Sequence, residues 1–71
     1  MSITLYSTHC PKCKVIESKL KQVGLEYTEV TDVDEMLKRG FRMAPILEVD
    51  GQIMDFSAAN KFLKSLAQGG N

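Results

Sequence analysis

The chain has 71 residues, of which 44% are hydrophobic and 25% charged, and its 9 basic and 9 acidic residues give a formal net charge of 0. This length predicts one small domain over residues 1–71, and the balanced charge gives no overall basic field, so we expect no nucleic-acid partner. No apolar run reaches the roughly 18 residues of a membrane-spanning helix, and the start of the chain lacks the features of a signal peptide, so we expect a cytoplasmic protein.

The first part of the chain predicts a strand followed by a helix. Residues 3–7 are rich in β-branched and aromatic side chains, as expected of a strand. Cys10 is the expected N-cap of the helix, because Pro11 suits the first helical position, where no backbone N–H is needed. Gly24 is a natural residue for the end of the helix. The apolar stripe of this helix has the spacing i, i+4, i+7 and consists of Ile16, Leu20 and Val23.

The middle of the chain predicts a second strand and a short helix. Residues 25–31 alternate in polarity, which is typical of a strand. Asp32 is the expected cap of the helix, because Glu35 lies three residues further on, as in a capping box. Gly40 is expected to end this helix. Its apolar side is expected to consist of Val33, Met36 and Leu37.

The last part of the chain predicts a hairpin and a final helix. Residues 46–49 and 52–54 are the expected strands, and Asp50-Gly51 between them is a strong signal for a hairpin turn. Ser57 is the expected N-cap of the final helix. The inner face of that helix is expected to consist of Ala59, Phe62, Leu63 and Leu66.

These elements predict an α/β fold with the order β-α-β-α-β-β-α. The first two strands should be parallel and joined by a right-handed crossover, whereas the last two should form an antiparallel hairpin. The simplest packing is a four-stranded mixed sheet with helices on both faces. Because the sequence shows no obvious apolar seam, we expect a monomer.

Both cysteines lie in the motif Cys10-Pro11-Lys12-Cys13. The thiolate is the reactive form of cysteine, and a helix N-terminus and a nearby lysine lower the pKa of a thiol. We therefore expect Cys10 to be an exposed, acidic nucleophile and Cys13 to be a more buried, less acidic thiol that resolves a mixed disulfide. The alternative for such a pair is zinc. Structural zinc takes four ligands, and the chain adds only His9 to the two thiols, so no metal site is predicted.

Further residues are candidates for substrate binding. A cis Ala44–Pro45 bond would turn the chain sharply beside the cysteines and leave the Ala44 backbone free to pair with an extended substrate, although Pro45 is also typical of a strand start. Phe56-Ser57 begins a helix whose N–H groups can hold a carboxylate. The alternative is that Phe56 only packs in the core and Ser57 only caps the helix. The candidate substrate-binding residues are Pro11, Lys12, Ala44, Pro45, Phe56 and Ser57.

With Cys10-Pro11-Lys12-Cys13 after a strand and Pro45 before a hairpin, nearly the whole chain resembles a glutaredoxin-like small redoxin of the thioredoxin superfamily. The resemblance implies a thioredoxin-like fold, a cis bond at Pro45, Cys10 as nucleophile and Cys13 as resolver. It also implies an enzyme, a thiol–disulfide oxidoreductase that reduces protein disulfides and supplies electrons to reductive enzymes in cell redox homeostasis. It implies no bound cofactor, only the redox-active disulfide.

The resemblance leaves two electron donors as alternatives, thioredoxin reductase and glutathione. Glutaredoxins usually carry Lys or Arg where this chain has Ser7, an aromatic residue where it has Lys12, and a Gly-Gly pair where it has Met54-Asp55. In length the chain is similar to the small redoxins that serve ribonucleotide reductase and are recharged by thioredoxin reductase. Ribonucleotide reductase is thus one implied substrate. A glutathione-dependent glutaredoxin and a metal- or iron–sulfur-binding redoxin are the alternative functions.

Overall fold

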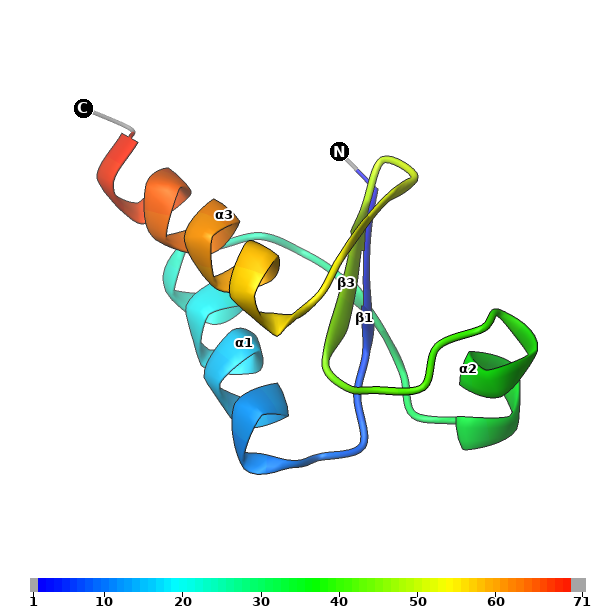
Figure 1. Cartoon of the computed structure of the whole chain (residues 1–71). Helices are drawn as coiled ribbons and strands as arrows, with labels where there is room; N and C mark the ends of the chain where they lie inside the picture. The colour runs from blue at the N-terminus through cyan, green and yellow to red at the C-terminus, as the bar shows by residue number, and fades with distance from the viewer. Residues whose placement is uncertain (1, 70–71) are drawn as a thin grey trace.

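The computed structural model describes residues 2–69, which form a four-stranded sheet and three helices (Figure 1). The elements are β1 (Ile3–Tyr6), α1 (Pro11–Gln22), β2 (Thr28–Val30), α2 (Val33–Lys38), β3 (Ile46–Val49), β4 (Gln52–Met54) and α3 (Phe56–Gly69). The strand order is β2-β1-β3-β4, with β1 parallel to β2, and with the β1–β3 and β3–β4 pairs antiparallel. The expected α/β fold with a mixed sheet is confirmed, and it is thioredoxin-like.

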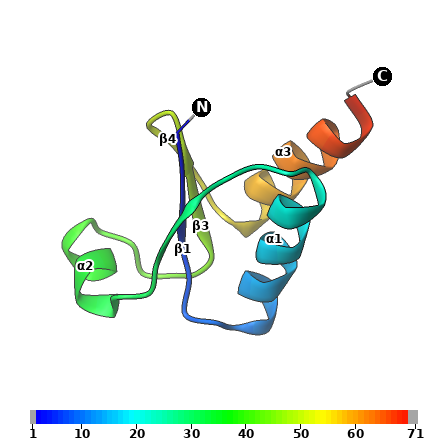
Figure 2. The ribbon, with the colours of Figure 1, turned by 180° about the vertical axis from the view of Figure 1, so that it is seen from behind.

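The helices cover both faces of the sheet, as expected. α1 and α3 pack side by side on one face, and α2 lies on the other (Figures 1 and 2). The main core lies between the sheet and the α1–α3 layer and consists of Ile3, Leu5, Ile16, Leu20, Leu47, Val49, Met54, Ala59 and Leu63. A smaller cluster on the opposite face joins α2 to the sheet and consists of Tyr6, Met36 and Ile46. This packing fixes the start of α1 beside the end of β1.

The apolar side of α2 differs from the expected one. Met36 is buried, but the exposed fractions of Val33 and Leu37 are 52% and 56%. The helix has only six residues, and a helix this short presents little more than one turn to the sheet. Met36 packs against the sheet, whereas the side chains of Val33 and Leu37 remain exposed.

The strand boundaries are narrower than expected. β1 ends at Tyr6, so Ser7 already belongs to the loop before α1. β2 covers only Thr28–Val30 instead of residues 25–31. Leu25 and Tyr27 nevertheless pack against the main core. The alternating pattern therefore extends beyond β2, because the loop before the strand also buries apolar side chains. This is why the sequence predicted a longer strand.

The start of α3 also corrects an expectation. The Asp55 carboxylate accepts a hydrogen bond from the Ala58 backbone N–H at 2.9 Å, so Asp55, and not Ser57, is the N-cap. Aspartate caps helices as well as serine does, and here it begins the helix two residues earlier. Leu66 is 37% exposed, because the C-terminal end of α3 extends past the sheet (Figure 1).

The hairpin between β3 and β4 is confirmed. Asp50 and Gly51 both have positive φ angles, 49° and 87°, as two-residue hairpin turns of the primed type require. The Asp50 carboxylate also accepts a hydrogen bond from the Ser2 backbone N–H at 2.7 Å. The turn is therefore anchored to the residue that precedes β1.

Candidate functional site

Cys10 is the N-cap of α1, as expected, with an extended backbone (φ −72°, ψ 166°) and Pro11 at the first helical position. Its Sγ accepts a hydrogen bond from the Cys13 backbone N–H at 3.2 Å. The side chain is half-buried, so the sulfur has one open side. A sulfur in this place faces the unpaired N–H groups and the positive end of the helix dipole, which favour negative charge there.

Cys13 lies one turn into α1 and is fully buried. The Thr8 hydroxyl oxygen lies 4.0 Å from its Sγ, and the hydroxyl of buried Ser7 accepts a hydrogen bond from the His9 backbone N–H at 3.1 Å. Burial raises the pKa of the Cys13 thiol, but hydrogen bonds from the neighbouring thiol, from Thr8 and from Ser7 outweigh burial and hold the pKa below its ordinary value. The buried sulfur can therefore carry negative charge.

Cys13 was expected to be a more buried and less acidic thiol than Cys10; its burial agrees with this, and its own pKa is held below the ordinary value. The reason is the set of donors around it, which the sequence did not reveal. Exposure then decides which sulfur meets a partner: Cys10 is half-buried and Cys13 is fully buried. The Thr8 contribution comes from its backbone, which no residue type signals, so the Ser7 hydroxyl was the one side-chain signal before the motif.

Replacing Ser7 with Ala should raise the pKa of the Cys13 thiol, because the change removes a hydrogen bond to the thiolate while burial still opposes ionisation. The pKa can be read from the ultraviolet absorbance of the thiolate during a pH titration of the Cys10→Ser variant, with and without Ser7→Ala. Ser65→Ala, at an exposed position of α3, is the matched control and should leave the titration unchanged. An unchanged or lower pKa in Ser7→Ala would contradict this role of Ser7.

The Ala44–Pro45 peptide bond is cis, as expected. The Cys10 thiol donates to the Ala44 carbonyl oxygen, with 3.9 Å between sulfur and oxygen. Ala44 is half-buried, whereas Pro45 is fully buried. The structure thus brings Ala44 to the sulfur of Cys10 and places the ring of Pro45 in the interior, behind the loop that carries Ala44.

The remaining candidate residues lie near the starts of α1 and α3. The Lys12 ammonium lies 5.3 Å from the centroid of the Phe56 ring, a cation–π contact between the two helices. Phe56 also packs against the main core. Pro11 and Ser57 are exposed at the first turns of their helices. None of these four residues lines the groove beside Cys10.

A groove of about 230 Å³ opens beside Cys10 on the α2 side of the site. Its lining is largely apolar, and the exposed fractions of Val33, Leu37 and Met43 are 52%, 56% and 62%. The lining residues are Thr8, Cys10, Val33, Met36, Leu37, Phe41, Arg42, Met43 and Ala44. Exposed apolar side chains around a reactive sulfur are typical of a surface that contacts another molecule.

Sequence reasoning missed most of this groove. Val33 and Leu37 were expected only on the apolar side of the short helix, and Met43 was not among the candidate residues. The signal was present in the sequence: three apolar residues on a six-residue helix are more than so short a helix can bury.

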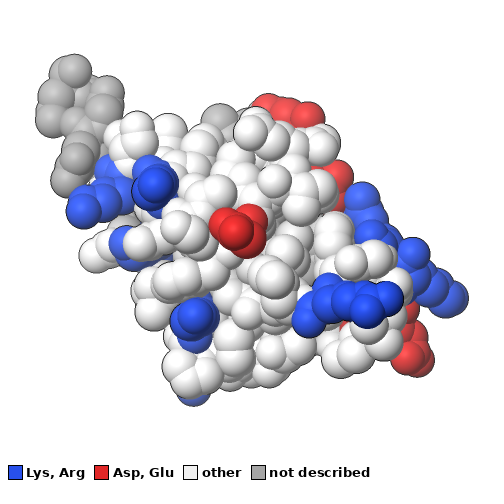
Figure 3. All heavy atoms as spheres, viewed as in Figure 1, with Lys and Arg blue, Asp and Glu red and all other residues white. Residues whose placement is uncertain are grey.

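The charged residues form no continuous basic area on the face shown in Figure 3. Lys and Arg side chains lie toward both flanks of this face and are separated by a broad uncharged stretch with few acidic side chains. This distribution agrees with the formal net charge of 0. None of the helices among residues 2–69 is long and apolar enough to cross a membrane.

Comparison with known proteins gives one informative match. No family model matches the sequence. The chain is similar to a protein named thioredoxin from Methanothermobacter thermautotrophicus (strain Delta H), with 30% identity over 59 residues. The match covers 75% of this chain and 77% of that protein.

Proposed function

Because the chain belongs to the thioredoxin family, we propose that it is a thiol–disulfide oxidoreductase that reduces protein disulfides through a reversible Cys10–Cys13 disulfide. The observation that carries this proposal is the position of Cys10. Its sulfur caps α1, accepts the Cys13 N–H at 3.2 Å and opens onto an apolar groove. The second sulfur lies one helical turn behind it, fully buried and with a lowered pKa.

The reaction proceeds in two exchanges. The Cys10 thiolate attacks one sulfur of the substrate disulfide, so that a mixed disulfide forms and the other substrate sulfur leaves as a thiolate. The Cys13 thiolate then attacks the Cys10 sulfur, which closes the Cys10–Cys13 disulfide and releases the second substrate thiolate. The substrate gains two electrons and two protons, and the enzyme loses the same number. The lowered pKa of Cys13 favours the second exchange, since the thiolate is the attacking form.

The groove supports a protein as the substrate. Its exposed apolar side chains, among them Leu37 and Met43, offer an extended peptide a surface that a small polar disulfide would not use. The Ala44 backbone lies beside the Cys10 sulfur, where it can pair with such a peptide, and buried Pro45 shapes this loop from behind. On the side of Cys10 away from the groove, the substrate would contact residues at the starts of α1 and α3, namely Pro11, Lys12, Phe56 and Ser57. Ribonucleotide reductase is one candidate substrate.

Thioredoxin reductase is the electron donor that the site favours over glutathione. Ser7 is fully buried, so its position offers no exposed cation for a glutathione carboxylate. The Asp55 carboxylate already accepts a hydrogen bond from a backbone N–H at the start of α3. A negative charge at this helix N-terminus competes with an incoming carboxylate.

The oxidised protein should therefore be reduced by thioredoxin reductase and NADPH, and much more slowly by glutathione with glutathione reductase and NADPH. The measurement is NADPH consumption with insulin as the disulfide substrate, using several bacterial and archaeal thioredoxin reductases. The Cys10→Ser/Cys13→Ser variant provides the blank for each donor. Turnover only with glutathione would make the protein a glutathione-dependent glutaredoxin and overturn the proposed donor.

A further inference from the structure

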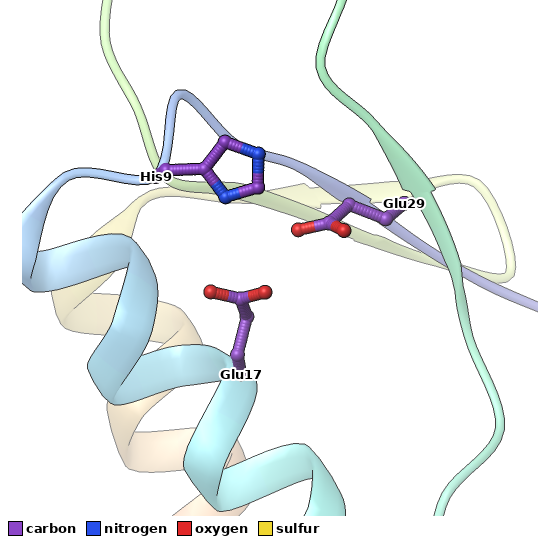
Figure 4. Close-up of side chains that lie close together, drawn as sticks. All are labelled: His9, Glu17 and Glu29. Carbon is purple, nitrogen blue, oxygen red and sulfur yellow. The ribbon is translucent and has the colours of Figure 1, made fainter.

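Three side chains that the redox mechanism does not use converge on the surface beside the site. His9 precedes the cysteine motif, Glu17 lies on α1 and Glu29 lies on β2. The potential ligand atoms of the three side chains all lie within 4.8 Å of one another. Figure 4 shows the imidazole ring and the two carboxylates facing a common space between the helix and the strand.

The charges around this cluster leave it negative. Glu17 and Glu29 place two carboxyl groups beside the His9 imidazole, and Lys21 is a positive charge near Glu29. Two carboxylates held this close repel each other unless a proton or a cation lies between them.

We propose that His9, Glu17 and Glu29 form a binding site for a divalent transition-metal ion of the zinc class. One imidazole nitrogen and two carboxylate oxygens are a donor set that zinc accepts, with a fourth position left for water. The imidazole distinguishes this cluster from an acidic surface patch, because magnesium and calcium favour sites made of oxygen ligands alone.

The spacing of the donors fits such an ion after small side-chain movements. Zinc binds nitrogen and oxygen ligands at about 2.0–2.2 Å, which places the ligand atoms of a tetrahedral site about 3.4 Å apart. The three ligand atoms are within 4.8 Å of one another. His9 and Glu29 are exposed, so rotation of these side chains can close the remaining distance. Half-buried Glu17 provides the more fixed ligand.

The site can be tested with Zn²⁺ alone on the oxidised protein, in which the Cys10–Cys13 disulfide removes the thiols as competing ligands. Calorimetry should show saturable binding of one zinc ion per chain. His9 is the only histidine in the sequence, so NMR signals of its imidazole should shift during the titration. Glu29→Gln should raise the dissociation constant for zinc by at least about tenfold. Mg²⁺ should not compete with zinc for the site.

A matched variant separates a site from general charge effects. Glu26→Gln changes the net charge equally at an exposed position three residues before Glu29, and it should leave zinc affinity unchanged. Equal weakening by Glu26→Gln and Glu29→Gln would overturn the proposal, as would unchanged His9 signals on saturation. Absence of saturable binding to the folded oxidised protein would also overturn it, whatever the outcome of the redox assays.

Discussion

Replacing Cys10 with Ser should lower kcat/KM for reduction of a protein disulfide by a factor on the order of 10³ or more, because a hydroxyl cannot replace the attacking thiolate. The Cys10 sulfur is the half-exposed member of the pair and opens onto the apolar groove. Fully buried Cys13 cannot reach a folded substrate in its place. The measurement is insulin reduction at fixed pH with a chemical dithiol as reductant, so that no reductase limits the rate.

The Cys13→Ser variant is the matched control for this loss. It keeps the Cys10 sulfur and removes only the resolving thiol, so it should accumulate a mixed disulfide between Cys10 and the substrate. Mass spectrometry detects the trapped species, which in this variant can form only through Cys10, the cysteine that remains. Full activity of Cys10→Ser, a mixed disulfide through Cys13 in Cys10→Ser, or no trapped species in Cys13→Ser would contradict the assigned roles.

Replacing Leu5 with Ala should destabilise the fold by about 2–5 kcal/mol, the range for removing a buried leucine side chain and leaving a cavity. Leu5 is fully buried on β1, which pairs with both β2 and β3. A domain of 71 residues has a total stability of roughly 4–11 kcal/mol, so this loss is a large share of the whole. Urea denaturation followed by circular dichroism should show a lower midpoint or an unfolded protein.

Leu37→Ala makes the same chemical change at an exposed position. Because Leu37 is 56% exposed, the free energy of unfolding should change by only about 0.5 kcal/mol. Equal destabilisation by the two variants would contradict the placement of the core between the sheet and the α1–α3 layer.

The parts of the site that depend on local chemistry were predictable from the sequence. A proline directly after Cys10 places that cysteine at the helix N-cap, because proline tolerates the first helical position, and the structure confirms it. The Asp50-Gly51 turn was predicted in the same way and is confirmed, and the cis bond before Pro45, which the family resemblance implied, is confirmed too.

The parts that depend on tertiary packing were not predicted, although residue types gave a partial signal for some of them. A periodic pattern marks Val33 and Leu37 as apolar but does not say that a six-residue helix leaves them uncovered. The hydrogen bonds that lower the pKa of Cys13 come from residues in the preceding loop. The ligand atoms of His9, Glu17 and Glu29 meet only because the fold brings the loop before α1, α1 itself and β2 close together at this point.

The most direct test of the central claim is to follow the two thiols through a complete redox cycle. Purified protein is equilibrated in buffers with a graded ratio of reduced to oxidised dithiothreitol or glutathione, and free thiols and intact mass are measured in each. The expected result is that Cys10 and Cys13 lose and regain their thiols together within one chain, with a midpoint between about −120 and −270 mV. Thiols that stay reduced throughout, or that pair only between chains, would contradict it.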